Sequence, residues 1–308
     1  MNAENKFPFP ASDGPASDGR IRFGLDGRSV ALDKRVNAVR GDLADISLAG
    51  ILFAPHYAKA QAMHCVGAAT FVREAGSHEA RASSQLLAGE AFHLLDVTGD
   101  WAWGFCGHDG YVGYVERAAL ETGALVATHK IIARTASIFA QADIKTPVVG
   151  TLSAGARIAG EQQGDFVVTA QGAVHVRHLA PVSECRADWI AAAEQQLGQP
   201  YVWGGRGAGG LDCSGLVQLA LGQAGINVPR DTDLQRESMG EELAEDAPLQ
   251  RGDIIFFPGH VGIMMDGEAM LHANAYWMST VIEPLADVVA RLQPDHEQPI
   301  LKRRRIML

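Results

Sequence analysis

The sequence predicts an α+β chain in which two small β-barrels precede a separate domain of mixed helices and strands. From about residue 65 to residue 182, short apolar runs alternate with Gly, Ser and Asp turns, the pattern of small all-β domains. From residue 184 the apolar residues take helical spacing, and the remainder to residue 308 combines helical and strand patterns. Hydrophobic residues make up 47% of the chain, which is ample material for such cores.

The β-rich region contains a repeated pattern that predicts one barrel over residues 65–125 and a second over residues 126–183. Each half contains a Gly-Asp pair followed by an aromatic residue, at Gly99-Asp100-Trp101 and at Gly164-Asp165-Phe166. Each half then ends in a strand and a short terminal segment. This arrangement resembles two copies of the bacterial SH3-like domain. A single larger β domain is the alternative.

Residues 1–64 carry no recognisable chemistry. Residues 1 to about 30 are rich in Ala, Ser, Asp, Gly and Pro, a composition that predicts a flexible arm. The rest predicts a short packed segment whose buried side is formed by Leu43, Ile46, Leu48 and Ile51.

Charge and composition exclude several classes of partner. The net charge of −10 argues against nucleic acid and anionic membranes, and the basic run Lys302–Arg305 is too short to change this. No apolar stretch is long enough to span a bilayer, and the first twenty residues lack the features of a signal peptide. The four cysteines form no C-x-x-C pair, as in a reducing compartment. We therefore expect a cytoplasmic protein.

The stretch GGRGAGGLDCSGLVQLAL, residues 204–221, has two interpretations. Residues 205–210 match G-x-G-x-x-G, and Asp231 follows at the distance of a ribose-binding acid. A dinucleotide site also needs a buried strand before the loop and a βαβ unit around it, and neither pattern is present. We therefore predict no cofactor.

The second interpretation places a nucleophile at Cys213. A helix follows the loop, with an apolar stripe formed by Leu216, Val217, Ala220, Leu221 and Ala224. Asp212 is then the N-cap and Cys213 the first helical residue, where the helix dipole is expected to lower the pKa of a thiol.

A nucleophilic cysteine needs a base, and His260 and His272 lie in a suitable context. The segment RGDIIFFPGHVGIMMDGEAMLHANA predicts a strand at 254–257, another from His260, and a third carrying His272. If Asp266-Gly267-Glu268 forms a three-residue loop with the glycine at positive φ, both histidines share one face and His272 lies opposite Gly262. No metal site is predicted, because the Cys and His residues lack the spacing of zinc ligands.

These residues match a known family. YVWGG…LDCSGLVQLAL, RGDIIFF…HVGI and MLHANA resemble the three signature blocks of the NlpC/P60 cysteine peptidases, over about residues 185–308. Together with the SH3-like units they are similar to the YkfC-like and dipeptidyl-peptidase VI-like members. The resemblance implies a papain-like fold over residues 184–308. It also implies cleavage of the γ-D-glutamyl–L-diamino-acid bond of murein peptides with a free N-terminal L-Ala.

The resemblance also implies roles for individual residues. Cys213 would be the nucleophile, His260 the base and His272 the residue that orients the base. The peptide pocket would be lined by Trp203, Asp212, Ser214 and a tyrosine of the first SH3-like unit, for which Tyr111 is preferred to Tyr114. Arg230, Asp231 and Thr232 would lie near the D-Glu carboxylate, and an acid such as Glu79 would help to bind the free ammonium group.

Three other functions stay open at this point. A secreted hydrolase of intact peptidoglycan would use the SH3-like units as wall anchors. A non-catalytic peptide-binding protein would carry an inactive last domain, and the Cys–His pair could also serve amide or acyl transfer. The sequence does not predict an oligomeric state.

Overall fold

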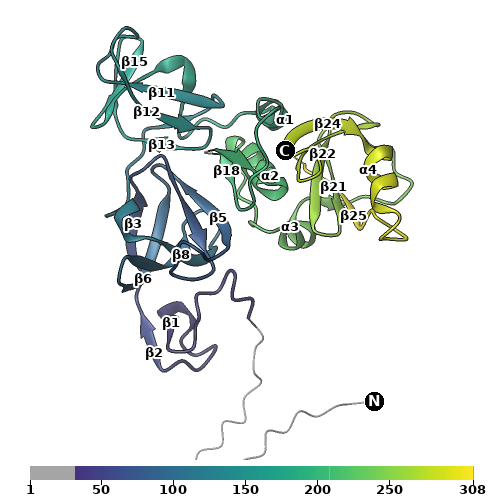
Figure 1. Ribbon diagram of the computed structural model, residues 1–308, viewed down its shortest axis with the longest axis horizontal. Coiled ribbons are helices and arrows are strands. Elements are labelled where there is room, and N and C mark those ends of the chain that lie inside the picture. The colour runs from purple at the N-terminus through teal and green to yellow at the C-terminus, as the bar shows by residue number, and fades with distance from the viewer. Residues whose placement is uncertain (1–31, 208, 308) are drawn as a thin grey trace, which may run out of the picture. The chain divides into compact units, whose positions relative to one another are not determined.

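The computed structural model describes residues 32–207 and 209–307. The predicted flexible arm, residues 1 to about 30, lies outside the described residues. Along the described chain, β-rich regions come first and a domain of mixed helices and strands follows (Figure 1). The predicted α+β class is confirmed.

The segment before the SH3-like region contains little regular structure. Strand β1 (Leu43–Asp45) pairs in parallel with β2 (His56–Ala58), and one turn of 3-10 helix, Ile46–Leu48, follows β1. Ala44, Leu48 and Ala54 form its small core. The predicted buried side is therefore wrong for Ile46 and Ile51, which are 50% and 51% exposed, because the backbone leaves the strand direction after Asp45.

The first SH3-like region is a seven-stranded antiparallel sheet. Its strands lie in the order β5-β4-β8-β7-β6-β3-β9. Their bounds are β3 Gln61–Cys65, β4 Ala69–Arg73, β5 Ala82–Leu87, β6 Ala91–Thr98, β7 Trp101–Cys106, β8 Val112–Glu116 and β9 Leu120–Thr122. The two end strands are not hydrogen-bonded to each other, so the expected closed barrel is an open, curled sheet over the described residues. The outer edge of β5 instead meets the C-terminal domain, where the Gln85 carbonyl accepts a hydrogen bond from Arg206.

The region predicted to be a second SH3-like unit is also built from short strands. Its strands are β10 His129–Ile131, β11 Thr135–Phe139, β12 Val148–Ser153, β13 Arg157–Ile158, β14 Glu161–Gln163, β15 Phe166–Thr169, β16 Gly172–His175 and β17 Leu179–Pro181. They form sheets in the orders β13-β10-β17 and β12-β11-β16-β15-β14, so neither sheet closes into a barrel over the described residues. The repeated Gly-Asp turns have the same backbone form, with φ of 58° at Gly99 and 60° at Gly164. The predicted domain boundaries at residues 65, 126 and 184 remain a proposal.

The C-terminal domain packs a central helix against a six-stranded sheet. Its helices are α1 Trp189–Glu194, α2 Cys213–Gln223, α3 Thr232–Ser238 and α4 Leu285–Leu292. Its strands are β18 Arg206–Gly207, β19 Gly210–Leu211, β20 Glu241–Glu242, β21 Asp253–Phe257, β22 His260–Met264, β23 Ala269–Asn274, β24 Ser279–Pro284 and β25 Lys302–Arg305. The sheet order is β20-β25-β21-β22-β23-β24.

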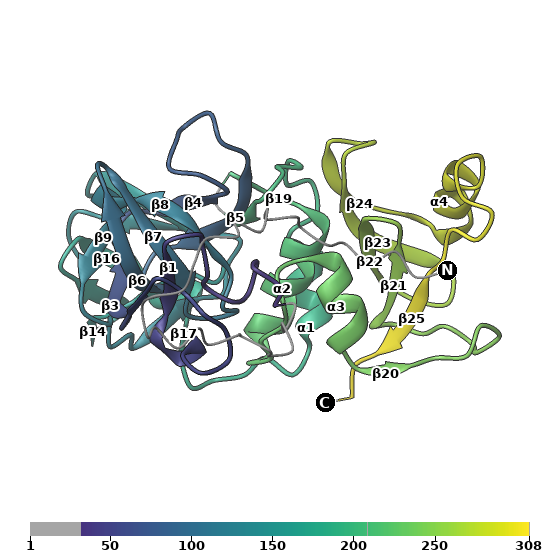
Figure 2. The same cartoon turned by 90° about the horizontal axis from the view of Figure 1, so that it is seen from below.

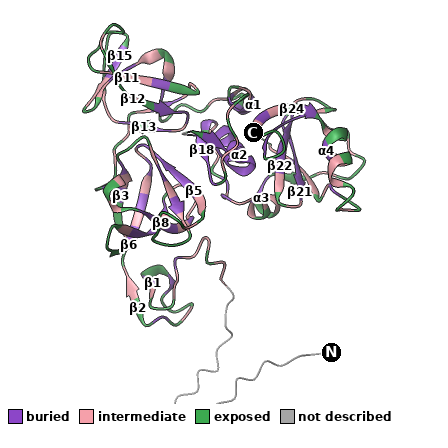
Figure 3. Ribbon diagram, viewed as in Figure 1, coloured by how far each residue is buried: buried purple, intermediate pink, exposed green. Residues whose placement is uncertain are grey.

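Helix α2 lies between β5 of the first SH3-like sheet and the sheet of the C-terminal domain (Figures 1 and 2). Figure 3 shows it as almost wholly buried, because it has neighbours on both sides. Helix α1 packs against it, with Trp189 and Ile190 buried, and ends at Glu194. None of the described helices is long and apolar enough to cross a membrane.

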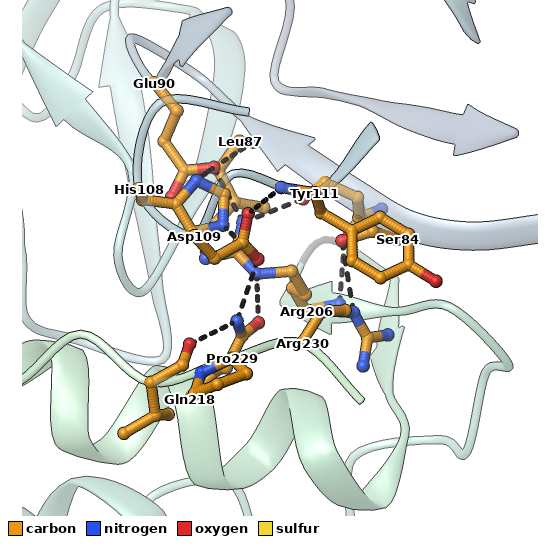
Figure 4. A network of polar contacts seen from close by, with 12 residues as sticks. Ser84, Leu87, Glu90, His108, Asp109, Tyr111, Arg206, Gln218, Pro229 and Arg230 are labelled. Carbon is orange, nitrogen blue, oxygen red and sulfur yellow. Dashed lines mark hydrogen bonds and ion pairs between the residues drawn. The ribbon is translucent and has the colours of Figure 1, made fainter. Parts of the chain in front are cut away.

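The glycine loop of the sequence is a short hairpin of β18 and β19 that faces the SH3-like sheet. Figure 4 shows the polar network at this contact. Arg206 donates two hydrogen bonds to Glu90, at 2.7 and 3.1 Å, and one to Oε1 of Gln218, at 2.9 Å. Gln218 donates in turn to Asp109 at 2.9 Å. Arg206 therefore joins two domains and points away from the start of α2.

Loss of this ion pair is expected to destabilise the protein. Arg206 and Glu90 are 7% and 5% exposed, so Arg206→Met leaves a buried carboxylate without its partner. The free energy of unfolding, measured in urea, should fall by about 3–5 kcal/mol, and adding Glu90→Gln should recover part of the loss. Arg251→Met, which removes an ion pair between half-exposed groups, is the control. A change below about 1 kcal/mol for Arg206→Met would contradict this expectation.

Candidate active site

Cys213 occupies the position that the sequence predicts, at the first residue of α2. Oδ1 of the N-cap Asp212 accepts a hydrogen bond from the Gly215 amide at 2.7 Å. The helix start packs closely against the glycine hairpin, since a Cβ on Gly215 would lie 2.2 Å from the Gly205 carbonyl oxygen. The glycines thus allow the two backbones to approach each other and fix the start of the helix.

The Cys213 thiol is buried and lies close to two other elements. Its sulfur is 3.8 Å from Oγ1 of Thr232 on α3, and it is hydrogen-bonded to the backbone of Val261, the residue after His260. Burial and then the Asp212 carboxylate raise the pKa of the thiol to about 11. The expected low pKa is therefore wrong for the free protein, because desolvation outweighs the helix dipole. Cys213 needs a base to become a nucleophile.

The histidine hairpin has the predicted register. Ile263 pairs with Leu271 and Met264 with Met270, so His272 stands opposite Gly262 and diagonal to His260. The loop contains the predicted residues 266–268, but Gly267 is not at positive φ. The Asp266 carboxylate closes the turn instead, accepting hydrogen bonds from the Glu268 and Ala269 amides at 2.7 Å each.

A chain of polar contacts begins at His260. His260 Nε2 lies 2.8 Å from His272 Nδ1, and His272 Nε2 lies 2.9 Å from Oε1 of Glu283 on β24. Arg291 on α4 holds Glu283 through two hydrogen bonds of 2.9 and 2.6 Å. His272 thus engages Nε2 of His260, whereas His260 Nδ1 has no hydrogen-bond partner among residues 32–207 and 209–307.

Burial keeps both imidazoles neutral. It lowers the pKa of His260 to about 3, with the neighbouring His272 as the second cause, and it lowers the pKa of His272 as well. Since an unfolded histidine titrates near 6.5, the unfolded state binds more protons below that pH. The stabilisation is therefore complete above pH 6.5 and is lost as the pH falls toward the folded pKa values.

Acid is accordingly expected to destabilise the protein through this pair. The free energy of unfolding should decrease by up to about 1.4 kcal/mol per pH unit for each histidine below pH 6. Urea titrations between pH 7 and pH 4 measure this slope, and the slope should be shallower in His260→Gln. An equal slope in that variant would show that other groups cause the acid sensitivity.

A cleft of about 1000 Å³, including its part open to solvent, lies in front of Cys213. It brings together every predicted substrate-binding residue, namely Tyr111, Trp203, Asp212, Ser214, Asp231 and Thr232. Arg35, Glu74, Ser83, Tyr201, Arg230, Asp233 and Arg236 also line it, together with Phe257 and Gly259 next to His260. Tyr114 and Glu79 are not in the lining. Tyr114 contacts Arg40 instead.

The carboxylate of Asp212 is not free to pair with an ammonium group of a substrate. Both of its oxygens accept hydrogen bonds from the guanidinium of Arg230, which is 1% exposed. Arg230 also donates to Ser214 Oγ at 2.7 Å, and the Gly204 amide donates to Asp212 Oδ2 at 2.9 Å. Asp212 therefore shapes the cleft wall together with Arg230, and its carboxylate is already neutralised.

Asp231 is the acid that faces the SH3-like tyrosine. The Tyr111 hydroxyl donates to Asp231 Oδ2 at 3.1 Å, and Arg35 donates to the same oxygen at 2.8 Å. Arg35 also bonds both oxygens of Asp233, and its carbonyl accepts from the Val112 amide at 2.7 Å. Burial raises the pKa of Asp231, while the charges of Arg230 and Arg35 oppose this rise.

Sequence reasoning missed several residues of this region. Arg35 belongs to a segment without motifs, and only the fold brings it to Asp231. Glu74 takes the place expected for Glu79, and its carboxylate has no hydrogen-bond or ionic partner among residues 32–207 and 209–307. Glu283 lies outside the signature blocks. The one available signal was the strand pattern after His272, which places a carboxylate beside it.

One cluster in the described residues has donor types that can bind a metal. Atoms of Cys106, His108 and Asp109 lie within 4.8 Å of one another. However, Asp109 already accepts hydrogen bonds from Gln218 and from the Tyr111 amide, and its Oδ2 lies 3.1 Å from His108 Nε2. This cluster belongs to the polar network between the domains (Figure 4).

Comparison with known proteins identifies two domains. Residues 198–287 match the model of the NlpC/P60 family, and residues 72–120 match the bacterial dipeptidyl-peptidase SH3 domain. A probable endopeptidase of Mycobacterium bovis is 37% identical over 99 residues, 31% of this chain and 25% of that protein. Dipeptidyl-peptidase 6 of Lysinibacillus sphaericus is 34% identical over 89 residues, 29% of this chain and 32% of that protein. The match thus spans a third or less of these relatives.

Solved structures extend the likeness in fold beyond these domains. An NlpC/P60 family protein from Bacillus cereus superposes with a TM-score of 0.67 at 19% identity, covering 80% of this chain and all of that one. An NlpC/P60 endopeptidase from Photobacterium damselae gives a TM-score of 0.56 at 16% identity, covering 79% of this chain and 71% of that one. These structures speak for the fold alone. Residues 198–287 therefore form an NlpC/P60 family domain, and a bacterial dipeptidyl-peptidase SH3 domain precedes it at residues 72–120.

Proposed function

We propose that this protein is a cysteine endopeptidase that hydrolyses the γ-D-glutamyl–L-diamino-acid bond of murein stem peptides with a free N-terminal L-Ala. The observation that carries the proposal is one cleft that holds the buried Cys213, Phe257 and Gly259 beside the strand that begins at His260, and a set of acids from three segments. The match of residues 198–287 to the NlpC/P60 family model supports the reaction type, and the likeness to a dipeptidyl-peptidase SH3 domain supports a short peptide as substrate.

The reaction begins with proton transfer from Cys213 Sγ to His260 Nδ1. The thiolate attacks the γ-carbonyl of D-Glu, and the oxyanion is stabilised by the Cys213 amide at the start of α2. The amine of the diamino acid leaves with the proton from His260, and a thioester remains on Cys213. Water, deprotonated by the same imidazole, hydrolyses the thioester and releases the dipeptide.

The acids of the cleft suit the ammonium group of L-Ala. A buried ammonium ion needs a carboxylate and hydrogen-bond acceptors, because an unpaired charge is costly to desolvate. Glu74 supplies a carboxylate that has no partner among the residues that the structure describes, and Asp231 with Tyr111 supplies a carboxylate and a hydroxyl. We assign the amine to this acidic end, with Ser214, Trp203 and Thr232 along the rest of the dipeptide. Since intact murein carries this amine as an amide, the substrate is a released wall fragment, which fits cytoplasmic recycling.

Arg35 is expected to support binding of the substrate's amine at the acidic end of the cleft. It holds Asp231 ionised and oriented, so Arg35→Gln should raise KM for the free-amine peptide by about tenfold or more while kcat stays within about twofold. Steady-state kinetics measure both constants. Arg40→Gln is the matched control, because Arg40 lies in the same segment but pairs with Asp42 and Asp96 away from the cleft. An unchanged KM in Arg35→Gln would refute this role.

One set of assays tests the proposal. The protein is incubated with L-Ala-γ-D-Glu-meso-diaminopimelate, with the same peptide N-acetylated, and with purified sacculi, and the products are separated by liquid chromatography. We expect release of diaminopimelate from the free peptide alone. Equal cleavage of the acetylated peptide, or cleavage of sacculi, would instead support a hydrolase of intact peptidoglycan. Binding without cleavage would support a peptide-binding protein.

A further inference from the structure

The contacts of His272 Nε2 pose a conflict. This atom lies 2.9 Å from Glu283 Oε1, which can only accept a hydrogen bond, and 2.8 Å from Asn274 Nδ2, which can only donate one. The amide of Asn274 cannot simply turn over, since its Oδ1 accepts from the Trp277 backbone amide at 2.8 Å. One proton position on His272 satisfies Glu283, and the other satisfies Asn274.

The two proton positions on His272 have opposite consequences for His260. If His272 donates from Nε2 to Glu283, its Nδ1 accepts from His260 Nε2, and His260 Nδ1 is free to take the Cys213 proton. If Nε2 accepts from Asn274, His272 donates from Nδ1 to His260 Nε2. His260 then carries its proton on Nδ1 and is no base.

We propose that Glu283 is a positioning residue that selects the tautomer of His272 and thereby makes His260 the base. Glu283 is 9% exposed and lies between His272 and the guanidinium of Arg291. A hydrogen bond to an ionised carboxylate is about twice as strong as one from a neutral amide, so Glu283 prevails over Asn274. The proposal rests on the Cys213–His260 chemistry of the proposed function.

The surrounding charges keep Glu283 ionised. Its two hydrogen bonds from Arg291 are the main reason that its pKa falls to about 2. His260, His272 and Arg291 are the titratable or charged groups that act on the pair of histidines and Glu283. Arg291 itself also faces the ring of Tyr276 at 4.0 Å. Glu283 therefore stays an acceptor over the whole range in which His260 must work.

A swap of the two competing groups tests the proposal. Glu283→Gln removes the charge but keeps the size, and it should lower kcat by about 100-fold or more with KM within about twofold. Adding Asn274→Asp places a carboxylate 2.8 Å from His272 Nε2, where it can still accept from Trp277. The double variant should regain activity to within about tenfold of the wild type, which a merely structural role of Glu283 would not produce. Asp287→Asn, on the exposed side of α4, is the charge-matched control and should keep full activity.

Two measurements work without any substrate, so they separate failure of this proposal from failure of the proposed function. In ¹⁵N-labelled protein, NMR should show His272 and His260 protonated on Nε2 in the wild type, and His272 protonated on Nδ1 in Glu283→Gln. In a Cys185→Ser background, alkylation of Cys213 by iodoacetamide should slow in Glu283→Gln and recover in the swap. A wild-type His272 protonated on Nδ1, or equal alkylation rates in folded variants, would overturn the proposal.

Discussion

Cys213→Ala is expected to lower kcat for the free-amine peptide by about 10⁴-fold or more, because none of the other described cysteines lines the cleft. The variant should remain folded, since the substitution removes only the sulfur with its weak contacts to Thr232 Oγ1 and the Val261 backbone, and alanine is the best helix former. Liquid chromatography of overnight digests has the range to detect such a loss.

The control for this variant is Cys185→Ala. Cys185 is exposed, whereas Cys65 and Cys106 are buried in the first SH3-like sheet. Activity that survives Cys213→Ala but disappears with Cys185→Ala would show that Cys185, and not Cys213, is the nucleophile. Full activity in both variants would exclude a thioester mechanism.

His260→Asn is expected to lower kcat by about 10³-fold or more at pH 7. The Cys213 thiol has a pKa of about 11, so without a base it is almost entirely protonated at that pH. The loss should diminish as the pH rises toward 10, because hydroxide then produces thiolate directly. A pH profile of kcat for both proteins measures this recovery.

The double variant gives a stricter test. Since Cys213 and His260 act as a unit, Cys213→Ala with His260→Asn should be no less active than Cys213→Ala alone. Additive losses would mean that His260 contributes independently of the cysteine. A pH-independent loss in His260→Asn would point to a structural defect, which near-UV circular dichroism would reveal.

Local rules explain why part of the site was predictable. The N-cap at Asp212 and the place of Cys213 follow from three residues and the helix pattern after them. The diagonal placement of His260 and His272 follows from the alternation of side chains along the strands and from a three-residue loop. However, Asp266 rather than Gly267 stabilises the turn. Both features depend on short stretches of chain whose geometry is nearly fixed.

The remaining features depend on residues that are far apart in sequence. The pairing of Asp212 with Arg230 and of Arg35 with Asp231 could not be read from spacing, and neither could the contact of Arg206 with Glu90. The prediction of a low thiol pKa was wrong for the same reason, because burial of Cys213 near Thr232 and Val261 outweighs the helix dipole. The contact of β5 with Arg206 also joins residues that are far apart in sequence.

The central claim is that Cys213 attacks the γ-carbonyl of a peptide whose free amine lies at the acidic end of the cleft. An L-Ala-γ-D-Glu dipeptide with a diazomethyl ketone at the γ-carbon, together with its N-acetylated twin, tests both parts at once. Peptide mapping by mass spectrometry should find the free-amine probe on Cys213 alone, with much slower labelling by the acetylated twin. Labelling at Cys185, or equal rates for the two probes, would contradict the account.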